Sequence, residues 1–335
     1  MSPSGDRLSP LDVSFLHLET PRTAMHVGTV AIFAAPPHGP LDHERLAALV
    51  ARRIARAPRY RQKVRAVPGH LANPVWVDDE HFDINYHVRR SALPRPGTDD
   101  QLRELVGRVQ SRQLDRSRPL WELYVVEGLA DGRFAIITKV HHALLDDVSA
   151  VELGALLLDA DPNAPEAAPD PEWEPAGEPS ALGLVAAAVA DNLRRPTQVL
   201  DTLRSEVTDV RAVAGRMLDT AGGAVTALRR SLRPAPASPL DVRVGEQRRY
   251  GMAATALDDY KRIRKAHDGT VNDVILATVA GALRIWLLTR GESVTPATVV
   301  RAMVPVSVRG DEAGTDHRVR STPGAMTWMR SVGTL

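Results

Sequence analysis

Residues 133–147 read RFAIITKVHHALLDD, and this stretch determines how the rest of the chain is interpreted. Its first eight residues are rich in β-branched side chains and follow an Asp-Gly pair typical of a turn, which predicts a strand. Ser149 and Glu152 match a capping box, and the apolar run after them predicts a helix. The adjacent His141 and His142 therefore lie between the end of a strand and the start of a helix, where α/β folds often carry chemistry.

The histidine pair has three interpretations on its residues alone. Histidine titrates near neutrality, so it can act as a general base toward a hydroxyl, and Asp146 can orient a ring or brace the loop. Alternatively, adjacent histidines point to opposite faces of a strand, so one is a core residue, the other is exposed, and Asp147 is a turn residue. The third interpretation is a metal site, but no further ligands complete a zinc-like spacing nearby.

Composition narrows the class of protein. The chain has 335 residues, 44% of them apolar, which suffices for one large or two ordinary domains. The 42 basic and 41 acidic residues give a net charge of +1, which argues against a dedicated nucleic-acid binder. Cysteine is absent, which excludes disulfides, a thiol nucleophile and cysteine–zinc sites.

Because no apolar signal core starts the chain, and the apolar stretches at 182–190 and 274–283 are too short for a bilayer, we expect a cytoplasmic protein.

Residues 1–160 are expected to form one α/β domain that carries the histidine pair. Apolar alternation predicts extended segments at 25–33, 76–88 and 120–127. Helical spacing predicts helices at 41–57, which Pro58 ends, and at 99–114.

Residues 161–237 are expected to be a linker followed by a helical crossover. Proline, alanine and acidic residues dominate its start, and 182–232 is an alanine- and arginine-rich helical stretch. That stretch is interpreted as a packing helix in preference to a surface that rests on a membrane or lipid droplet, because its apolar side chains are mostly small. A partial second half is expected over 238–310, and 311–335 is an atypical tail without periodicity. The elements expected in the second half are strands at 250–257 and 298–308 and helices at 258–266 and 270–288.

Several spaced motifs stand in one order along residues 8–310. They are LSPLD at 8–12, FL at 15–16, ET at 19–20, MHVG at 25–28, RPLWE at 118–122, HHxxxD at 141–146, SPL at 238–240, VNDV at 271–274 and PVSVR at 305–309. In these motifs the chain resembles the bacterial wax ester synthase/acyl-CoA:diacylglycerol acyltransferases. The HHxxxD motif also occurs in peptide-synthetase condensation domains and other CoA-dependent acyltransferases, but the opening segment and Pro-Leu-Trp favour the lipid enzymes.

The resemblance implies an α/β (α+β) fold of the chloramphenicol acetyltransferase-like type, with two halves of mixed sheet flanked by helices and a tunnel between them. It implies an O-acyltransferase that moves a long fatty acyl group from acyl-CoA to diacylglycerol, a fatty alcohol, or both. No metal or bound cofactor and no nucleic-acid partner are expected. Peripheral contact with the inner face of the plasma membrane or with lipid droplets is compatible with such substrates.

The resemblance also assigns roles to residues. His142 would be the general base, while His141 and Asp146 would hold the loop. Asn272, at a helix N-terminus, would support the base or the developing oxyanion, and its alternative role is that of a helix cap. For Trp121, core packing is favoured over ligand contact.

The chain departs from the family pattern in two places. Asp147 replaces the glycine of the histidine motif, which adds a negative charge near the base and would raise the histidine's pKa if the two are close. After Arg309 the family pattern stops, so the second half is expected to be incomplete, and a reading-frame shift near codon 315 would explain the tail. Two alternatives to the enzyme therefore stay open: an inactive truncated homologue that at most binds lipid or acyl-CoA, and a condensation-type acyltransferase that uses a carrier protein.

Overall fold

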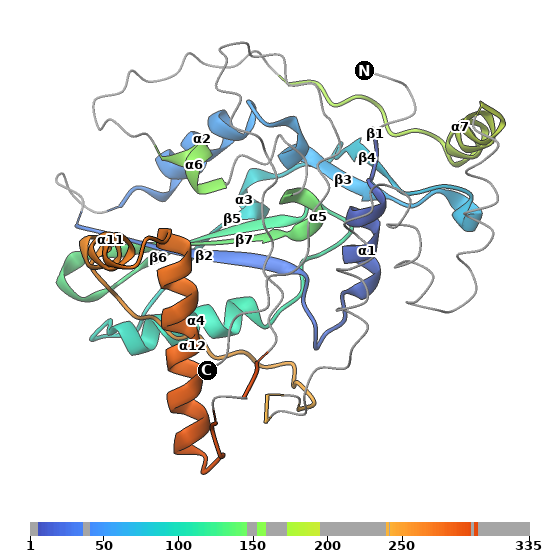
Figure 1. Ribbon diagram of the computed structural model, residues 1–335. Coiled ribbons are helices and arrows are strands. Elements are labelled where there is room, and N and C mark those ends of the chain that lie inside the picture. The colour runs from blue at the N-terminus through green and yellow to red at the C-terminus, as the bar shows by residue number, and fades with distance from the viewer. Residues whose placement is uncertain are drawn as a thin grey trace. The chain divides into compact units, whose positions relative to one another are not determined.

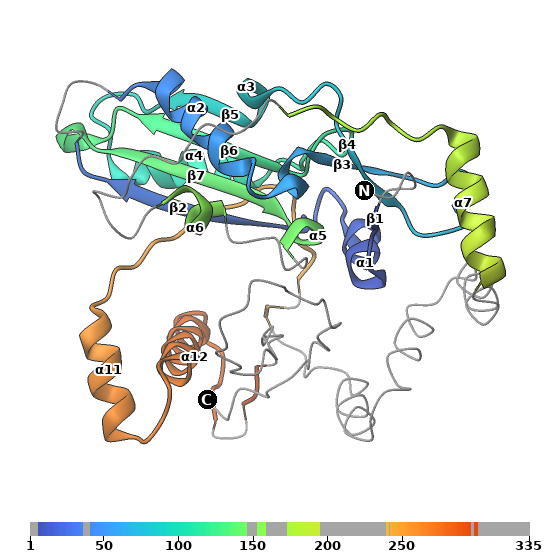
Figure 2. The same cartoon turned by 90° about the horizontal axis from the view of Figure 1, so that it is seen from above.

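The computed structural model describes residues 6–35, 41–145, 153–158, 173–194, 239–240, 242–295 and 298–300 (Figures 1 and 2). The chain divides into two compact units. The first comprises Met1–Arg204 with Val244–Gly251, and the second comprises Ser205–Arg243 with Met252–Leu335. Sheets flanked by helices form the described part of the first unit, which confirms the expected mixed α/β class.

A four-stranded mixed sheet forms the centre of the first unit, with the strand order β2-β7-β6-β5. The pairs β2–β7 and β7–β6 are antiparallel, whereas β6 and β5 are parallel. The strands are β2 (His26–Phe33), β5 (Val88–Ala92), β6 (Trp121–Glu127) and β7 (Phe134–His141). A smaller antiparallel sheet has the order β1-β4-β3, with β1 (Asp6–Arg7), β3 (Gln62–Arg65) and β4 (Val75–Asp78).

The pairing of β2 with β7 fixes where the histidines lie. The register places His26 opposite His141 and Thr29 opposite Thr138. The two threonine hydroxyls hydrogen-bond to each other across the strands. Because side chains alternate between the faces of a sheet, a slip of one residue would move His141 to the other face. The register of this pair is therefore part of the site.

Helices cover both faces of the larger sheet, with α2 and α6 on one side and α4 on the other (Figures 1 and 2). The α2 face packs Val50 and Ile54 against Trp121, Val125 and the neighbouring apolar strand residues. The helices of this unit are α1 (Pro10–Leu18), α2 (His43–Ile54), α3 (Ile84–His87), α4 (Asp99–Gln110), α5 (His142–Leu145), α6 (Leu153–Leu157) and α7 (Ala181–Arg194). Short 3₁₀ turns lie at Pro58–Arg61, Pro68–His70 and Ala130–Gly132.

Local sequence explains where the helices begin. The side chain of Ser9 accepts from the backbone N–H of Asp12, and the Asp12 carboxylate reaches back to Ser9, which forms a capping box at the start of α1. Thr98 and Gln101 form the same box at the start of α4. These caps satisfy N–H groups that the first helical turn leaves without intrahelical partners.

Helix α7 packs against the smaller sheet. Its buried Leu184 and Ala188 contact a cluster that includes Val75 and Val77 of β4. This contact favours the packing interpretation for the described part of the predicted helical stretch 182–232. The remainder of that stretch lies outside the described residues.

The second unit contributes two described helices, α11 (Leu257–Ala266) and α12 (Val271–Thr289). Thr270 and Asp273 form a capping box that starts α12. The helix has 19 residues with a mean hydropathy of 1.6, so by length and composition alone it is apolar enough to cross a membrane. Core helices of soluble proteins pass the same test. The expectation that the apolar stretch at 274–283 is too short for a bilayer was wrong, because this stretch belongs to a helix of 19 residues.

The structure confirms the expected strands ending at Phe33, Glu127 and near the histidines, and the helices α2, α4, α11 and α12. The extended segment expected at 76–88 was wrong in its second half. Asp83 accepts a hydrogen bond from the N–H of Asn85 at 2.9 Å and starts the short helix α3. Local capping thus overrides the apolar alternation there.

The strand expected at 250–257 was also wrong. Residues 242–256 form neither helix nor strand, and α11 begins at Leu257. Part of the segment lies along α4, where the N–H of Arg248 donates to the Ser111 hydroxyl at 2.7 Å. The backbone groups inside a helix are already hydrogen-bonded to one another, so a segment that lies along α4 cannot form strand-to-strand hydrogen bonds with it. Apolar alternation in this segment therefore does not produce a β-strand. Of the strand expected at 298–308, residues 298–300 form neither helix nor strand, and the remainder lies outside the described residues.

Candidate active site

His141 is the last residue of β7 and is completely buried. Its Nδ1 accepts a hydrogen bond from the backbone N–H of Ala143 at 3.0 Å. Its Nε2 lies 3.8 Å from Oε2 of Glu19. Burial is the main cause that lowers the pKa of His141 to about 4, with smaller lowering contributions from Arg116, His142 and His26 and an opposing one from Glu19. The ring is therefore neutral near pH 7.

His142 lies one residue further on and starts the helical turn α5. Its N–H donates to the carbonyl of Met25 at 2.8 Å, which ties the turn to the residue just before β2. Its partly exposed ring stacks on Phe15 of α1, with 5.1 Å between centroids and 26° between planes. The change from strand to helix at this point separates the two side chains. One histidine stays in the interior, and the other is accessible to a reactant.

Glu19 and Arg116 form an ion pair beside His141. The guanidinium donates to Glu19 Oε2 from Nε at 3.0 Å and from Nη2 at 2.6 Å. The glutamate side chain is 1% exposed, whereas that of Arg116 is 45% exposed. Arg116 also donates to the carbonyl of Leu16 at 2.7 Å. The pair therefore ties the C-terminal end of α1 to the segment that follows α4.

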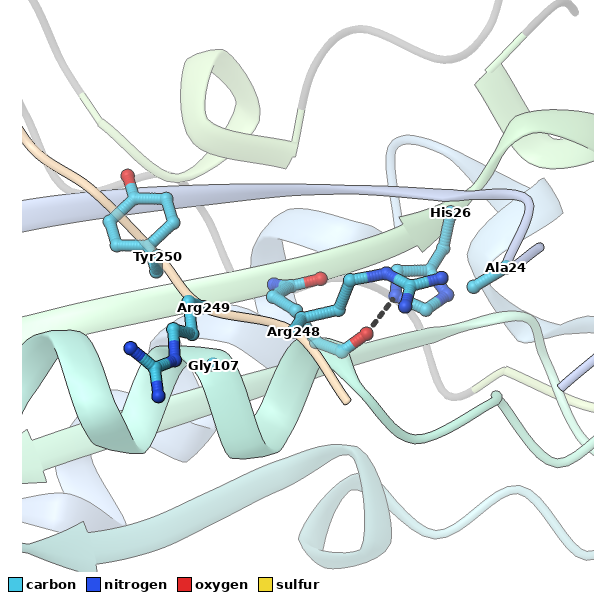
Figure 3. Close-up of a pocket in the computed structure, with 7 residues that line it drawn as sticks. Ala24, His26, Gly107, Arg248, Arg249 and Tyr250 are labelled. Atoms are coloured by element: carbon cyan, nitrogen blue, oxygen red, sulfur yellow. Dashed lines mark hydrogen bonds between the residues drawn. The ribbon is translucent and has the colours of Figure 1, made fainter. Parts of the chain in front are cut away.

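A small pocket lies on the α4 face of the sheet, close to where β2 begins (Figure 3). Its volume is about 250 Å³, and it is lined by Ala24, His26, Gly107, Gln110, Arg248, Arg249 and Tyr250. His26 Nε2 donates to the carbonyl of Gln110 at 3.1 Å, and burial lowers the pKa of His26 to about 4. Arg248 donates to the carbonyls of Gly245 and Arg22, so its guanidinium holds neighbouring backbone.

The model of the wax ester synthase/diacylglycerol acyltransferase catalytic domain matches residues 8–275. The chain belongs to this family. It is 44% identical to the Mycobacterium tuberculosis protein named probable diacylglycerol O-acyltransferase tgs3 over 263 residues, which are 78% of this chain and 96% of that one. It is 39% identical to probable diacylglycerol O-acyltransferase tgs2 of the same organism over 317 residues, which are 92% of this chain and 65% of that one.

Among solved structures, the chain resembles a wax ester synthase/diacylglycerol acyltransferase from Marinobacter aquaeolei VT8. The TM-score is 0.59 at 30% identity, and the match covers 88% of this chain and 63% of that one. The chain thus spans about two thirds of the length of two of these relatives. The resemblance in sequence and the expected fold class are confirmed.

The structure does not place the other predicted site residues beside His142. Asp146 and Asp147 are outside the described residues. Asn272 is an exposed residue in the first turn of α12, in the second unit. The cap of that helix is Thr270, whose side chain accepts from Asp273, so the alternative role of Asn272 as the cap itself was wrong. The role of Asn272 in acyl transfer stays a prediction.

Sequence reasoning missed Phe15, Glu19 and Arg116 as neighbours of the histidine pair. Phe15 lies on α1, and Glu19 is the residue that caps the C-terminal end of this helix, where its N–H donates to the carbonyl of Phe15. Their four-residue spacing was visible in the opening motif. The pairing of Glu19 with a residue 97 positions away has no local signal. No group of three or more metal-ligating side chains is found in the described ranges.

Replacing Gly107 by alanine is expected to loosen the segment Val244–Gly251. An added Cβ would lie 2.7 Å from the backbone oxygen of Arg248, so the segment must shift. Overpacking of this kind costs about 1–3 kcal/mol, which exceeds the gain of about 1 kcal/mol from alanine in a helix. We expect faster tryptic cleavage after Arg248 and Arg249 and a lower urea midpoint. Gly251→Ala is the matched control because nothing lies within 4 Å of its added Cβ. Equal cleavage rates in the two variants would contradict the prediction.

Proposed function

We propose that this chain forms esters by transferring a long-chain fatty acyl group from acyl-CoA to the hydroxyl of diacylglycerol or of a fatty alcohol. The observation that carries the proposal is the family match over residues 8–275, which includes the histidine motif at the end of β7. Relatives named as diacylglycerol O-acyltransferases support a glycerolipid acceptor. The Marinobacter aquaeolei protein, whose name includes wax ester synthase, supports a fatty alcohol as a second acceptor.

In the proposed reaction His142 is the general base. Its imidazole takes the proton of the acceptor hydroxyl while the oxygen attacks the thioester carbonyl. The tetrahedral intermediate then collapses, the C–S bond breaks, and the histidine returns the proton to the CoA thiolate. Two observations support this role: the ring is partly exposed, and stacking on Phe15 with the backbone bond to Met25 restricts its position. His141 is the weaker candidate, because its ring is buried and one nitrogen accepts the N–H of Ala143.

The experiment is an assay of the purified full chain with palmitoyl-CoA and either dioleoylglycerol or hexadecanol. Release of CoA is followed with a thiol reagent, which the protein does not consume because it contains no cysteine. Mass spectrometry identifies the ester, since thiol release alone also reports hydrolysis. We expect triacylglycerol, wax ester or both, dependent on donor and acceptor. A folded protein that forms neither product would refute the proposal, and a pantetheine-loaded carrier protein that outcompetes palmitoyl-CoA as donor would favour a condensation-type enzyme.

A further inference from the structure

Glu19 is surrounded by hydrogen-bond donors. Its Oε2 accepts two N–H groups of Arg116, and its Oε1 accepts the backbone N–H of Met25 at 3.3 Å. The same Oε2 faces Nε2 of His141 at 3.8 Å. An ionised carboxylate is acceptor-only, so it suits all of these neighbours at once. An amide in its place would have to turn an N–H toward at least one donor.

The tautomer of His141 follows from its other nitrogen. The N–H of Ala143 donates to Nδ1, so Nδ1 carries no proton. In the neutral ring the proton is then on Nε2, which points toward the Glu19 carboxylate. The charged and titratable groups that act on this ring are Glu19, Arg116, His142 and His26. Of these, only Glu19 is negative, and it favours a proton on the nitrogen that faces it.

Glu19 and His141 each contact the backbone next to His142. On one side, the N–H of Met25 donates to Glu19 and the carbonyl of Met25 accepts the N–H of His142. On the other side, the N–H of Ala143 is held by His141 Nδ1. The first of the two peptide N–H groups that begin α5 is therefore linked to Glu19 by hydrogen bonds through Met25, and the second is held by His141, whose Nε2 faces Glu19 at 3.8 Å.

We propose that Glu19 is a positioning residue for acyl transfer: its carboxylate, held by Arg116, acts together with the N–H of Ala143 to keep His141 in the Nε2–H tautomer, and through Met25 it helps to fix the turn that presents His142. This inference rests on the proposed function, because it assumes that His142 acts on the acceptor hydroxyl. Glu19 is buried behind His141 and acts through other residues. Its loss should therefore change the rate of the chemical step more than the binding of acyl-CoA.

The test is the substitution Glu19→Gln, which keeps the size of the side chain and removes its charge. Loss of an outer partner of a metal-bound histidine typically costs about 10- to 100-fold in metal affinity or activity, and by the same logic of ring orientation we expect a fall of that size in kcat with a change in KM of less than about twofold. The matched control is Glu122→Gln. Glu122 is also buried and ionic, but it pairs with Arg89 at 3.1 Å and accepts from Tyr124 at 2.8 Å. The control should lose stability with little change in kcat per folded molecule.

A second measurement does not depend on activity. Long-range ¹H–¹⁵N spectra of histidine-labelled protein report which ring nitrogen carries the proton, and His141→Gln assigns the signal. We expect the Nε2–H tautomer in the native chain and in Glu122→Gln, and its loss or exchange with the other tautomer in Glu19→Gln. A native tautomer and a native kcat in Glu19→Gln would overturn the inference, as would an equal loss of kcat in Glu122→Gln. If the native chain forms no ester, the proposed function fails, and the spectra still decide the role of Glu19 at His141.

Discussion

Replacing His142 by alanine should reduce ester formation by about 10²- to 10⁴-fold, the usual contribution of a positioned general base. The substitution removes the ring that stacks on Phe15 and keeps the backbone N–H that donates to Met25. The turn is therefore expected to stay in place while the proton acceptor is lost. The effect should appear in kcat for both classes of acceptor alcohol, because the same base serves both.

The measurement is the initial rate of ester formation, with the melting temperature recorded to confirm folding. His267→Ala is a suitable control because His267 is an exposed residue of the second unit. His142→Gln separates proton transfer from loss of side-chain volume, since glutamine fills much of the space and is not a base at neutral pH. A His142→Ala variant that forms ester at the native rate would rule out the proposed mechanism, although the family membership would stand.

The largest expected effect on stability is that of Trp121→Ala, which should lower the free energy of unfolding by about 3–5 kcal/mol. Trp121 is fully buried in the core on the α2 face of the sheet. Its indole N–H donates to the carbonyl of Tyr60 at 2.7 Å, and its ring stacks on His87 with centroids 4.6 Å apart. Truncation therefore leaves a cavity and an unsatisfied carbonyl, both of which are costly.

Urea denaturation followed by circular dichroism measures this effect. Trp121→Phe is the informative comparison, because it keeps most of the apolar volume and loses only the indole hydrogen bond. We expect it to cost about 1–3 kcal/mol. Both variants should keep a native kcat per folded molecule. If Trp121→Ala leaves stability almost unchanged but abolishes activity, Trp121 contacts the ligand and its interpretation as a core residue is wrong.

The sequence predicted those parts of the fold that depend on local patterns. Strands β2, β6 and β7 follow from alternation and β-branched residues, and helices α4 and α12 follow from apolar spacing. The failures have physical causes that compete with these patterns. Asp83 accepts a hydrogen bond from the backbone N–H of Asn85, which starts a helix in an alternating segment. The backbone N–H of Arg248 donates to Ser111 at the end of α4 and not to a neighbouring strand.

The candidate site was predicted less completely than the fold. The position of the histidine pair at the end of a strand followed from the residues around it, and the structure agrees. The partners of the histidines are long-range: Phe15 and Glu19 come from the first helix, and Arg116 follows α4. Contacts of this kind depend on how sheets and helices pack, and a single sequence carries no periodic signal for them.

The pairing of β2 with β7 also sets the order in which this protein can be built during translation. Thr29 and Thr138 are 109 residues apart. At roughly 5–20 residues per second, the ribosome needs about 5 to 20 seconds to synthesise the chain between them. Throughout that interval β2 has no strand to pair with, because its described partner in the folded sheet is β7. Contacts of such high sequence separation slow folding and leave strand edges open to other chains. Slow synthesis or crowded expression should therefore be most harmful while residues 26–33 wait for the strand that ends in His141.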